Sequence, residues 1–183
     1  MSVSRPEEAP TIETKRLWLT AFTQADAEAV FAYASDPEVS RHTTWTPHRS
    51  IEDARAFITY ARGEEYCWAI RRVREGPAIG AIESSVESEG LASIHFVLAR
   101  EEWGQGIMTE AAKAVLTWAF ARYPSLALVR TAAVADNVAS RRVMEKCGMV
   151  FERFATESWA KCEVPVRLAV YRVTREAFGR RGS

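Results

Sequence analysis

The sequence predicts an α+β fold in which helices pack on a mixed sheet, and three observations lead to this class. The chain has 183 residues, the size of one domain with its own core. Hydrophobic residues make up 48% and charged residues 26%, a composition typical of globular proteins. The expected elements follow in the order β-α-α-β-β-β-α-β-α-β-β. This order excludes both a β-sandwich and a helical bundle.

The first part of the chain is expected to contain one strand and two helices. Residues 16–22 alternate between apolar and other side chains, which predicts a half-buried strand. A helix over residues 27–34 follows, and we expect Pro37 to close it. A loop over residues 40–50 then leads into a second helix over residues 50–61.

The middle of the chain is expected to contain three strands and a long helix. The strands cover residues 66–73, 78–85 and 92–99, and turn-forming residues separate them. A glycine loop then opens a helix over residues 106–122, whose apolar side chains form one stripe. Pro124 marks the end of this helix.

The last part of the chain is expected to contain three strands and one helix. A strand over residues 126–134 leads into a helix over residues 137–147, which Gly148 stops. Two strands over residues 149–159 and 165–173 complete the sheet.

Residues 12–174 form one predicted domain, between a leader over residues 1–11 and a tail over residues 175–183. The leader lacks the basic and apolar segments of a secretory signal, and no apolar run approaches the ~20 residues of a membrane span. Basic and acidic residues number 24 each, so net charge provides no general attraction to nucleic acid or to an anionic membrane. We therefore expect a soluble cytoplasmic protein that binds neither.

The cysteines and histidines predict neither disulfides nor a metal site. The three cysteines are an odd number without a CxxC pair, which favours reduced thiols. The three histidines lack the spacing of metal ligands, so we predict no metal. These residues are Cys67, Cys147, Cys162, His42, His48 and His95.

A strand, a Gly-x-Gly turn and a helix follow one another around Gly104, Gln105 and Gly106. A helix N-terminus presents unpaired N–H groups and a partial positive charge, and glycines let the backbone approach a phosphate closely. This arrangement indicates a pyrophosphate site, although glycines also serve ordinary turns. A Rossmann loop is excluded because Thr109 replaces its third glycine, and a P-loop because no Gly-Lys-Ser/Thr follows.

A second polar segment begins at Asp136, directly after a predicted strand. Asn137 and Ser140 lie one helical turn apart, so both can face one ligand from the start of a helix. The alternative is that Asp136 or Asn137 only caps that helix.

These two segments, in this order and spacing, resemble the GNAT N-acetyltransferase superfamily over nearly all of the chain. The similarity is greatest to the Rim type, the N-terminal (alanine) acetyltransferases of ribosomal proteins. Four stretches carry the resemblance, and the second is the most specific. They are residues 13–17 (ETKRL), 103–111 (WGQGIMTEA), 136–148 (DNVASRRVMEKCG) and 168–171 (LAVY).

The resemblance implies a three-layer α/β arrangement with a mixed, mostly antiparallel seven-stranded sheet and helices on both faces. It implies acetyl-CoA as cosubstrate, in an opening where strand 92–99 splays from strand 126–134. Strand backbone would bind the pantetheine, the glycine loop the pyrophosphate, and Asn137 the pantetheine arm. The implied cofactor-binding residues are Phe96, Val97, Leu98, Trp103, Gly104, Gln105, Gly106, Ile107, Met108, Thr109, Asn137 and Ser140.

The resemblance also implies that a primary amine attacks the thioester directly, without an acyl-enzyme. The acceptor is a protein N-terminus or a small amine such as an amino acid, polyamine or antibiotic; a non-catalytic acyl-CoA sensor is the alternative. Monomer and homodimer both remain open. Catalysis needs a neutral amine and a protonated leaving thiolate, and the candidate residues are His95 as base and Ser140 as acid.

Three positions depart from the family pattern. Glu101 stands where many members have Gln or Arg, and we expect it to point away from the pyrophosphate. Met144 stands where other branches carry a general-acid Tyr, which leaves Ser140 as the candidate donor to the sulfur. Arg167 replaces an Asp of the closing strand, so the usual acceptor contacts do not carry over directly.

The remaining candidates each have a structural alternative. His95 is either a base or a packed strand histidine, and Glu83 either a base or cation contact or a solvated carboxylate. Trp45 and Trp159 either wall the acceptor pocket or belong to the core. We expect surface positions for His42 and His48, packing under the glycine loop for Trp103, a buried structural thiol for Cys147, and a solvated face rather than a 3′-phosphate contact for Arg141, Arg142 and Lys146.

Overall fold

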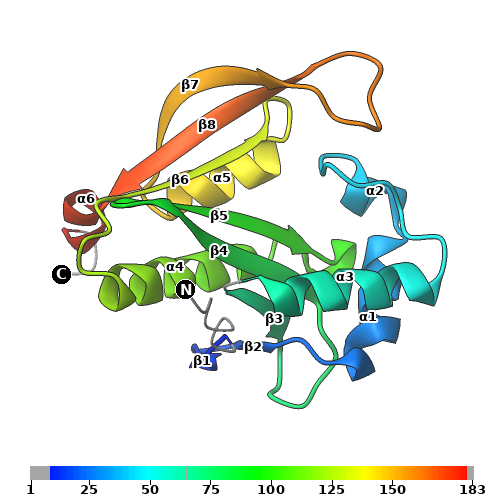
Figure 1. The fold of residues 1–183 in the computed structure, drawn as a ribbon. Helices are drawn as coiled ribbons and strands as arrows, with labels where there is room; N and C mark the ends of the chain where they lie inside the picture. Colours follow the sequence, from blue (N-terminus) through cyan, green and yellow to red (C-terminus); the bar gives the residue numbers. More distant parts are fainter. Residues whose placement is uncertain (1–8, 65, 181–183) are drawn as a thin grey trace, which may run out of the picture.

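The computed structural model describes residues 9–64 and 66–180, and the rest of the predicted leader and tail lies outside them (Figure 1). The strands are β1 (Ile12–Glu13), β2 (Trp18–Ala21), β3 (Cys67–Arg71), β4 (Gly80–Ser88), β5 (Leu91–Leu98), β6 (Leu128–Val134), β7 (Val150–Glu157) and β8 (Val166–Thr174). The helices are α1 (Ala27–Ala34), α2 (Pro37–Ser40), α3 (Ile51–Gly63), α4 (Ile107–Arg122), α5 (Val138–Lys146) and α6 (Arg175–Gly179), with 3₁₀ turns η1 (Gln24–Asp26) and η2 (Arg100–Glu102).

The strands form one sheet in the order β1-β2-β3-β4-β5-β6-β8-β7. All neighbours are antiparallel except β5 and β6, so the prediction of a mixed, mostly antiparallel sheet is confirmed. The predicted number of strands was wrong: the described residues form eight, not seven. The additional strand is β1, which has two residues and is too short to show an alternating pattern.

Helices cover both faces of the sheet, as predicted, because successive strand side chains point to opposite faces. On one face, large side chains such as Trp68, Ile82 and Ile94 pack against α4 and α5. On the other, smaller side chains such as Ala69 and Ala81 pack against α1 and α3 (Figure 1). The two faces therefore have separate cores.

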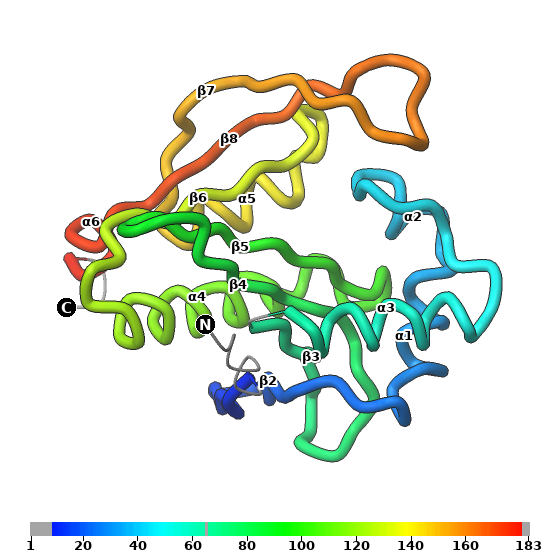
Figure 2. Tube along the Cα trace, viewed as in Figure 1, coloured from blue at the N-terminus to red at the C-terminus, as the bar shows by residue number. Residues whose placement is uncertain are grey.

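The sheet opens between its two parallel strands. β5 and β6 pair only from Leu91 to Ser93, opposite Leu128 to Arg130. Beyond this point β5 continues along β4 to Leu98, while β6 continues along β8 to Val134, and the two strands diverge (Figure 2). The predicted splay is therefore present.

Two local predictions were wrong. Pro37 does not simply close the first helix but begins α2, where the Asp36 carboxylate caps the turn by accepting a hydrogen bond from the Glu38 N–H at 2.8 Å. Proline is tolerated there because the first residues of a helix have no partner for their N–H groups. The expected tail begins with α6, and the Arg175 guanidinium donates to the carbonyls of Phe120 in α4 and of Tyr123 and Leu126 in the α4–β6 connection.

Candidate active site

The glycine loop connects η2 to α4 at the open end of β5. Gly104 and Gly106 have positive φ angles of 76° and 75°, a backbone region that L side chains rarely adopt, and Gly106 is the N-cap of α4. A Cβ added at Gly104 would meet no atom within 4 Å. The loop therefore presents exposed backbone and a helix N-terminus to open space, which suits the phosphate of a ligand.

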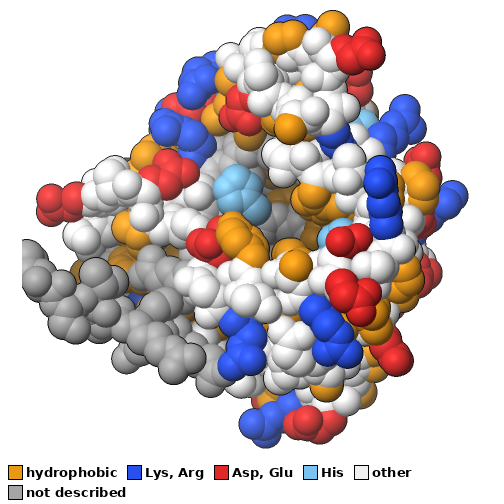
Figure 3. Space-filling view, turned by 45° about the vertical axis from the view of Figure 1, so that its right-hand side comes forward, with side chains coloured by type: hydrophobic (Ala, Val, Ile, Leu, Met, Phe, Trp, Pro, Cys, Tyr) orange, Lys and Arg blue, Asp and Glu red, His pale blue; other side chains and the backbone are white. Residues whose placement is uncertain are grey.

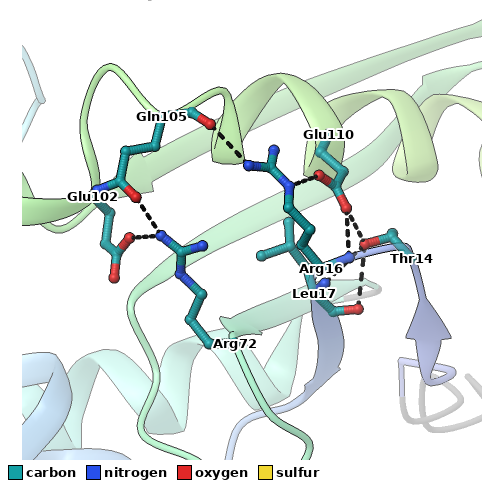
Figure 4. Close-up of polar contacts among 7 residues, drawn as sticks. All are labelled: Thr14, Arg16, Leu17, Arg72, Glu102, Gln105 and Glu110. Atoms are coloured by element: carbon teal, nitrogen blue, oxygen red, sulfur yellow. Dashed lines mark hydrogen bonds and ion pairs between the residues drawn. The ribbon is translucent and has the colours of Figure 1, made fainter.

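Two arginines from distant parts of the chain hold this loop (Figure 4). Arg16, just before β2, donates from Nη1 to the Gln105 carbonyl at 3.1 Å and from Nε to Glu110 Oε2 at 2.7 Å. Arg72, just after β3, donates to Gln105 Oε1 at 2.6 Å and pairs with Glu102. Sequence reasoning did not find these roles, although Arg16 lies in the first of the four family-like stretches.

Along β5, successive residues direct their backbone N–H and C=O groups alternately toward β4 and toward the opening. The Ala99 N–H donates to the Ile79 carbonyl at 2.8 Å, so odd-numbered residues of this strand, Val97 among them, face β4. The backbone of Phe96 and Leu98 consequently faces the opening. The predicted role of Val97 as a backbone contact therefore does not fit this alternation.

Trp103 does not pack beneath the loop, contrary to expectation. Its side chain is 45% exposed, and its indole N–H donates to the Leu98 carbonyl at 2.9 Å. The indole ties the loop to the end of β5 and occupies one of the two Leu98 backbone groups. Ile107 and Met108, predicted among the cofactor contacts, have buried side chains, so they can offer only backbone groups to a ligand.

The start of α5 lies on the other side of the opening, directly after β6. Asn137 Oδ1 accepts a hydrogen bond from the Ser140 N–H at 3.0 Å, so the cap that was the alternative interpretation is present. The cap uses the backbone of Ser140 and not its hydroxyl. Met144 is only 2% exposed and lies in the core between α4 and α5. Its position therefore cannot supply an acid to the opening.

Arg141 is not part of a solvated face, which corrects the expectation. Its Nε donates to the Tyr171 hydroxyl at 3.1 Å and its Nη1 to the Ala135 carbonyl at 3.1 Å. The guanidinium thereby fastens α5 to β8. Arg142 and Lys146 are exposed, as expected.

Glu83 and His95 are directly opposite each other on β4 and β5. Both point to the face covered by α1 and α3, since their neighbours Ile82 and Ile94 are in the core of the other face. Glu83 is half-buried and accepts a hydrogen bond from Ser85 Oγ at 2.8 Å, whereas His95 is exposed.

The Tyr60 hydroxyl of α3 interacts electrostatically with Glu83. Burial, together with the charges of Glu83 and Glu64, raises the pKa of Tyr60 to about 12. Glu83 and Glu64 therefore both act electrostatically on the Tyr60 hydroxyl.

Across the opening from Glu83 and His95, the β7–β8 loop contacts the loop that follows α2, and together they form a rim. The β7–β8 loop reaches over α2 (Figure 1), and Lys161 Nζ donates to the carbonyls of Ser40 at 2.5 Å and Trp45 at 3.1 Å. Lys161 Nζ also lies 5.8 Å from the centroid of the Trp159 ring. Both predicted pocket tryptophans therefore contact the same lysine, Trp45 through its backbone carbonyl and Trp159 through its ring. Histidine, carboxylate and apolar side chains gather around a hollow on this side of the molecule (Figure 3).

His42, His48 and Cys147 are each at least partly buried. His48 is half-buried: its Nδ1 is buried, its pKa is lowered by burial, and no partner for that atom exists in the described part of the chain. Half-buried His42 has its pKa lowered by burial and by Arg41. Cys147 is buried as predicted, and burial raises its pKa to about 11.

The remaining expectations concern Glu101, Arg167, metal binding and membrane spans. Glu101 is exposed, and Arg167 stacks over the Phe154 ring at 3.7 Å. Within residues 9–64 and 66–180, no group of three or more His, Cys, Asp or Glu side chains could hold a metal ion. The same residues include no helix that is both long and apolar enough to cross a membrane.

Comparison with known proteins identifies the family to which this fold and this opening belong. The profile of the acetyltransferase (GNAT) domain family matches residues 16–150. The uncharacterized N-acetyltransferase YoaA of Bacillus subtilis (strain 168) is 30% identical over 175 residues, which cover 91% of this chain and 97% of YoaA.

Solved structures share the fold. An acetyltransferase of the GNAT family from Bacillus anthracis is 26% identical, with a TM-score of 0.82 over 91% of this chain and 99% of its own. The microcin C7 self-immunity acetyltransferase MccE, solved with acetyl-CoA and AMP, has a TM-score of 0.77 at 15% identity, over 88% of this chain and 93% of MccE. The chain therefore belongs to the GNAT family and is an acetyl-CoA-dependent N-acetyltransferase.

Proposed function

We propose that acetyl-CoA lies in the opening between β5 and β6, with its pyrophosphate on the glycine loop. The observation that carries this proposal is the divergence of β5 and β6 after three paired residues, between the loop and the start of α5. Backbone N–H groups from Gly104 to Thr109 would hold the pyrophosphate. The backbone of Phe96 and the N–H of Leu98 would hold the pantetheine as an added strand does, and Asn137 would contact its arm.

Acetyl-CoA supplies a thioester whose carbonyl carbon a neutral amine attacks directly. His95, exposed beside half-buried Glu83, would accept the amine proton. The Ser140 hydroxyl, free of the helix cap, would donate a hydrogen bond to the departing sulfur. Solvent can also deprotonate an amine, so His95 carries the smaller of these two effects.

The proposed acceptor is a protein N-terminus. The resemblance to the Rim type favours it, and the two carboxylates that act on Tyr60, Glu83 and Glu64, would suit an ammonium group. A small amine is the second candidate, because the Lys161 contact joins the two loops of one rim and would narrow the approach for a bulky partner.

Mass spectrometry of acceptors incubated with acetyl-CoA separates these candidates. The panel contains peptides with the N-terminal sequences of ribosomal proteins, free amino acids, a polyamine and an aminoglycoside, with free-thiol release recorded in parallel. A mass increase of one acetyl group on the peptide α-amine supports the proposal. Acetylation of small amines alone selects the second candidate.

A non-catalytic acyl-CoA sensor is the remaining alternative. Its supporting observation is the buried Met144 at the position where other branches carry a tyrosine. Calorimetric binding of CoA together with no thiol release across the panel would select it and contradict catalysis.

A further inference from the structure

The glycine loop carries an electrostatic difficulty for a pyrophosphate ligand. Glu101 and Glu102 lie in η2, directly before the loop, and Glu110 lies in the first turn of α4. A carboxylate in the first turn of a helix interacts well with the helix dipole, but it repels a second anion bound at the same end. The loop therefore needs a compensating positive charge before it can hold a diphosphate tightly.

Arg16 compensates Glu110 directly. Glu110 Oε1 accepts hydrogen bonds from Thr14 Oγ1 at 2.7 Å and from the Arg16 backbone N–H at 2.9 Å, while Oε2 accepts from Arg16 Nε at 2.7 Å. Burial alone would raise the pKa of Glu110, but the hydrogen bonds from Thr14 and Arg16 outweigh it and lower the pKa. Glu110 is thus ionised and neutralised by a charge on the side of the loop that faces β2.

Arg16 also orients one peptide group of the loop. Its Nη1 draws the Gln105 carbonyl toward itself, and its Nη2 lies 3.6 Å from the position a Cβ would take at Gly106. In a trans peptide the carbonyl and the following N–H point in opposite directions. With the Gln105 carbonyl bound to Arg16 (Figure 4), the Gly106 N–H must point away from Arg16.

We propose that Arg16 is a positioning residue for the diphosphate of acetyl-CoA: it turns the Gly106 N–H toward the ligand and neutralises Glu110. This inference depends on the proposed binding of acetyl-CoA at the loop. Arg72 makes only side-chain contacts with Glu102 and Gln105, so it fixes the outer part of the loop and has the smaller effect.

Calorimetric titration of CoA into the full chain tests the proposal. Arg16→Met should weaken CoA binding about tenfold or more, since a charge-assisted hydrogen bond and a neutralised carboxylate are lost together. The double variant Arg16→Met/Glu110→Gln should recover part of that affinity, because the unpaired carboxylate is gone. Arg172→Met is the matched control: both arginine side chains are 42% exposed and paired with a glutamate, but Arg172 lies on β8.

A second readout separates positioning from general damage to the fold. The KM for acetyl-CoA should rise in Arg16→Met, while the KM for S-acetylpantetheine, which lacks the diphosphate, should stay within about twofold. Unchanged CoA affinity in Arg16→Met, or an equal rise in both KM values, would overturn the proposal. Failure of wild-type protein to bind CoA would instead remove the proposed function itself.

Discussion

The two sides of the opening are built differently, and the difference separates general activity from specificity. The proposed cofactor side consists of backbone: two left-handed glycines, the free edge of β5 and a capped helix start. The proposed acceptor side consists of side chains from distant segments, including Glu83, His95 and Lys161. Backbone geometry suits a ligand that every family member shares, whereas side chains can vary with each acceptor.

The two helical layers show the same contrast. The core beneath α4 and α5 is made of large apolar side chains. The core beneath α1 and α3 is rich in alanine and has polar groups at its edge: Asp26 and Arg71 form a buried ion pair, and the buried Tyr33 hydroxyl has no partner among the described residues. The layer of α1 and α3 therefore depends more on polar contacts for its stability.

The largest expected effect breaks that ion pair. Arg71 donates to both Asp26 oxygens, at 2.7 and 2.9 Å, and to the Gly76 carbonyl. Arg71→Met should lower the free energy of unfolding by about 3–5 kcal/mol, because an uncompensated buried carboxylate remains. Denaturant titration measures this, with the exposed Arg74→Met as control. A loss below about 1 kcal/mol would contradict the contrast between the layers.

The same pair predicts a pH dependence. Burial raises the pKa of Asp26, but the hydrogen bonds from Arg71 and Thr23 prevail and hold it below the ordinary value of 3.8. A lowered folded-state pKa contributes stability above the unfolded value, and this contribution is lost as pH falls through the folded value. The difference in unfolding free energy between wild type and Arg71→Met should therefore shrink below about pH 4.

The next effect concerns the cofactor side. Gly106→Asp should weaken CoA binding about 100-fold or more, through backbone strain at φ 75° and charge repulsion of the pyrophosphate. Gly90→Asp is the control, since Gly90 has φ 82° and lies in the turn at the far end of β5. Equal CoA affinity in folded Gly106→Asp and wild type would show that the glycine loop does not bind the pyrophosphate.

A smaller effect is expected at the start of α5. Ser140→Ala should lower kcat about tenfold with little change in CoA affinity, because the cap uses the Ser140 N–H, which alanine retains. Ser35→Ala, at the end of α1, should leave kcat unchanged. A normal turnover rate under conditions where chemistry limits would exclude the role of the hydroxyl.

The smallest effect belongs to the acceptor side. Lys161→Met removes the contact between the β7–β8 loop and the carbonyls of Ser40 and Trp45. The KM of the acceptor should rise a few-fold, about 1 kcal/mol, while CoA affinity stays constant. Lys113→Met, exposed on α4, serves as control. An equal change in CoA affinity would show that the two sides are not separable.

The contrast also explains what the sequence could predict. The helices α1, α3, α4 and α5, the long strands and the glycine loop follow from local patterns, and the splay from the family resemblance, so these could be placed in advance, whereas the short helices α2 and α6 were not predicted. β1 is too short to leave a pattern. The roles of Arg16 and Arg72 depend on partners that lie far along the chain, and the partial burial of His48 depends on tertiary packing with Trp45 and Phe57.

A crystal structure of the chain with CoA bound tests the central claim most directly. The account predicts that the diphosphate oxygens accept hydrogen bonds from N–H groups between Gly104 and Thr109, including that of Gly106. It also predicts that the pantetheine runs along Phe96 and Leu98 toward Ser140. A diphosphate held away from the glycine loop, or a pantetheine outside the opening between β5 and β6, would contradict it.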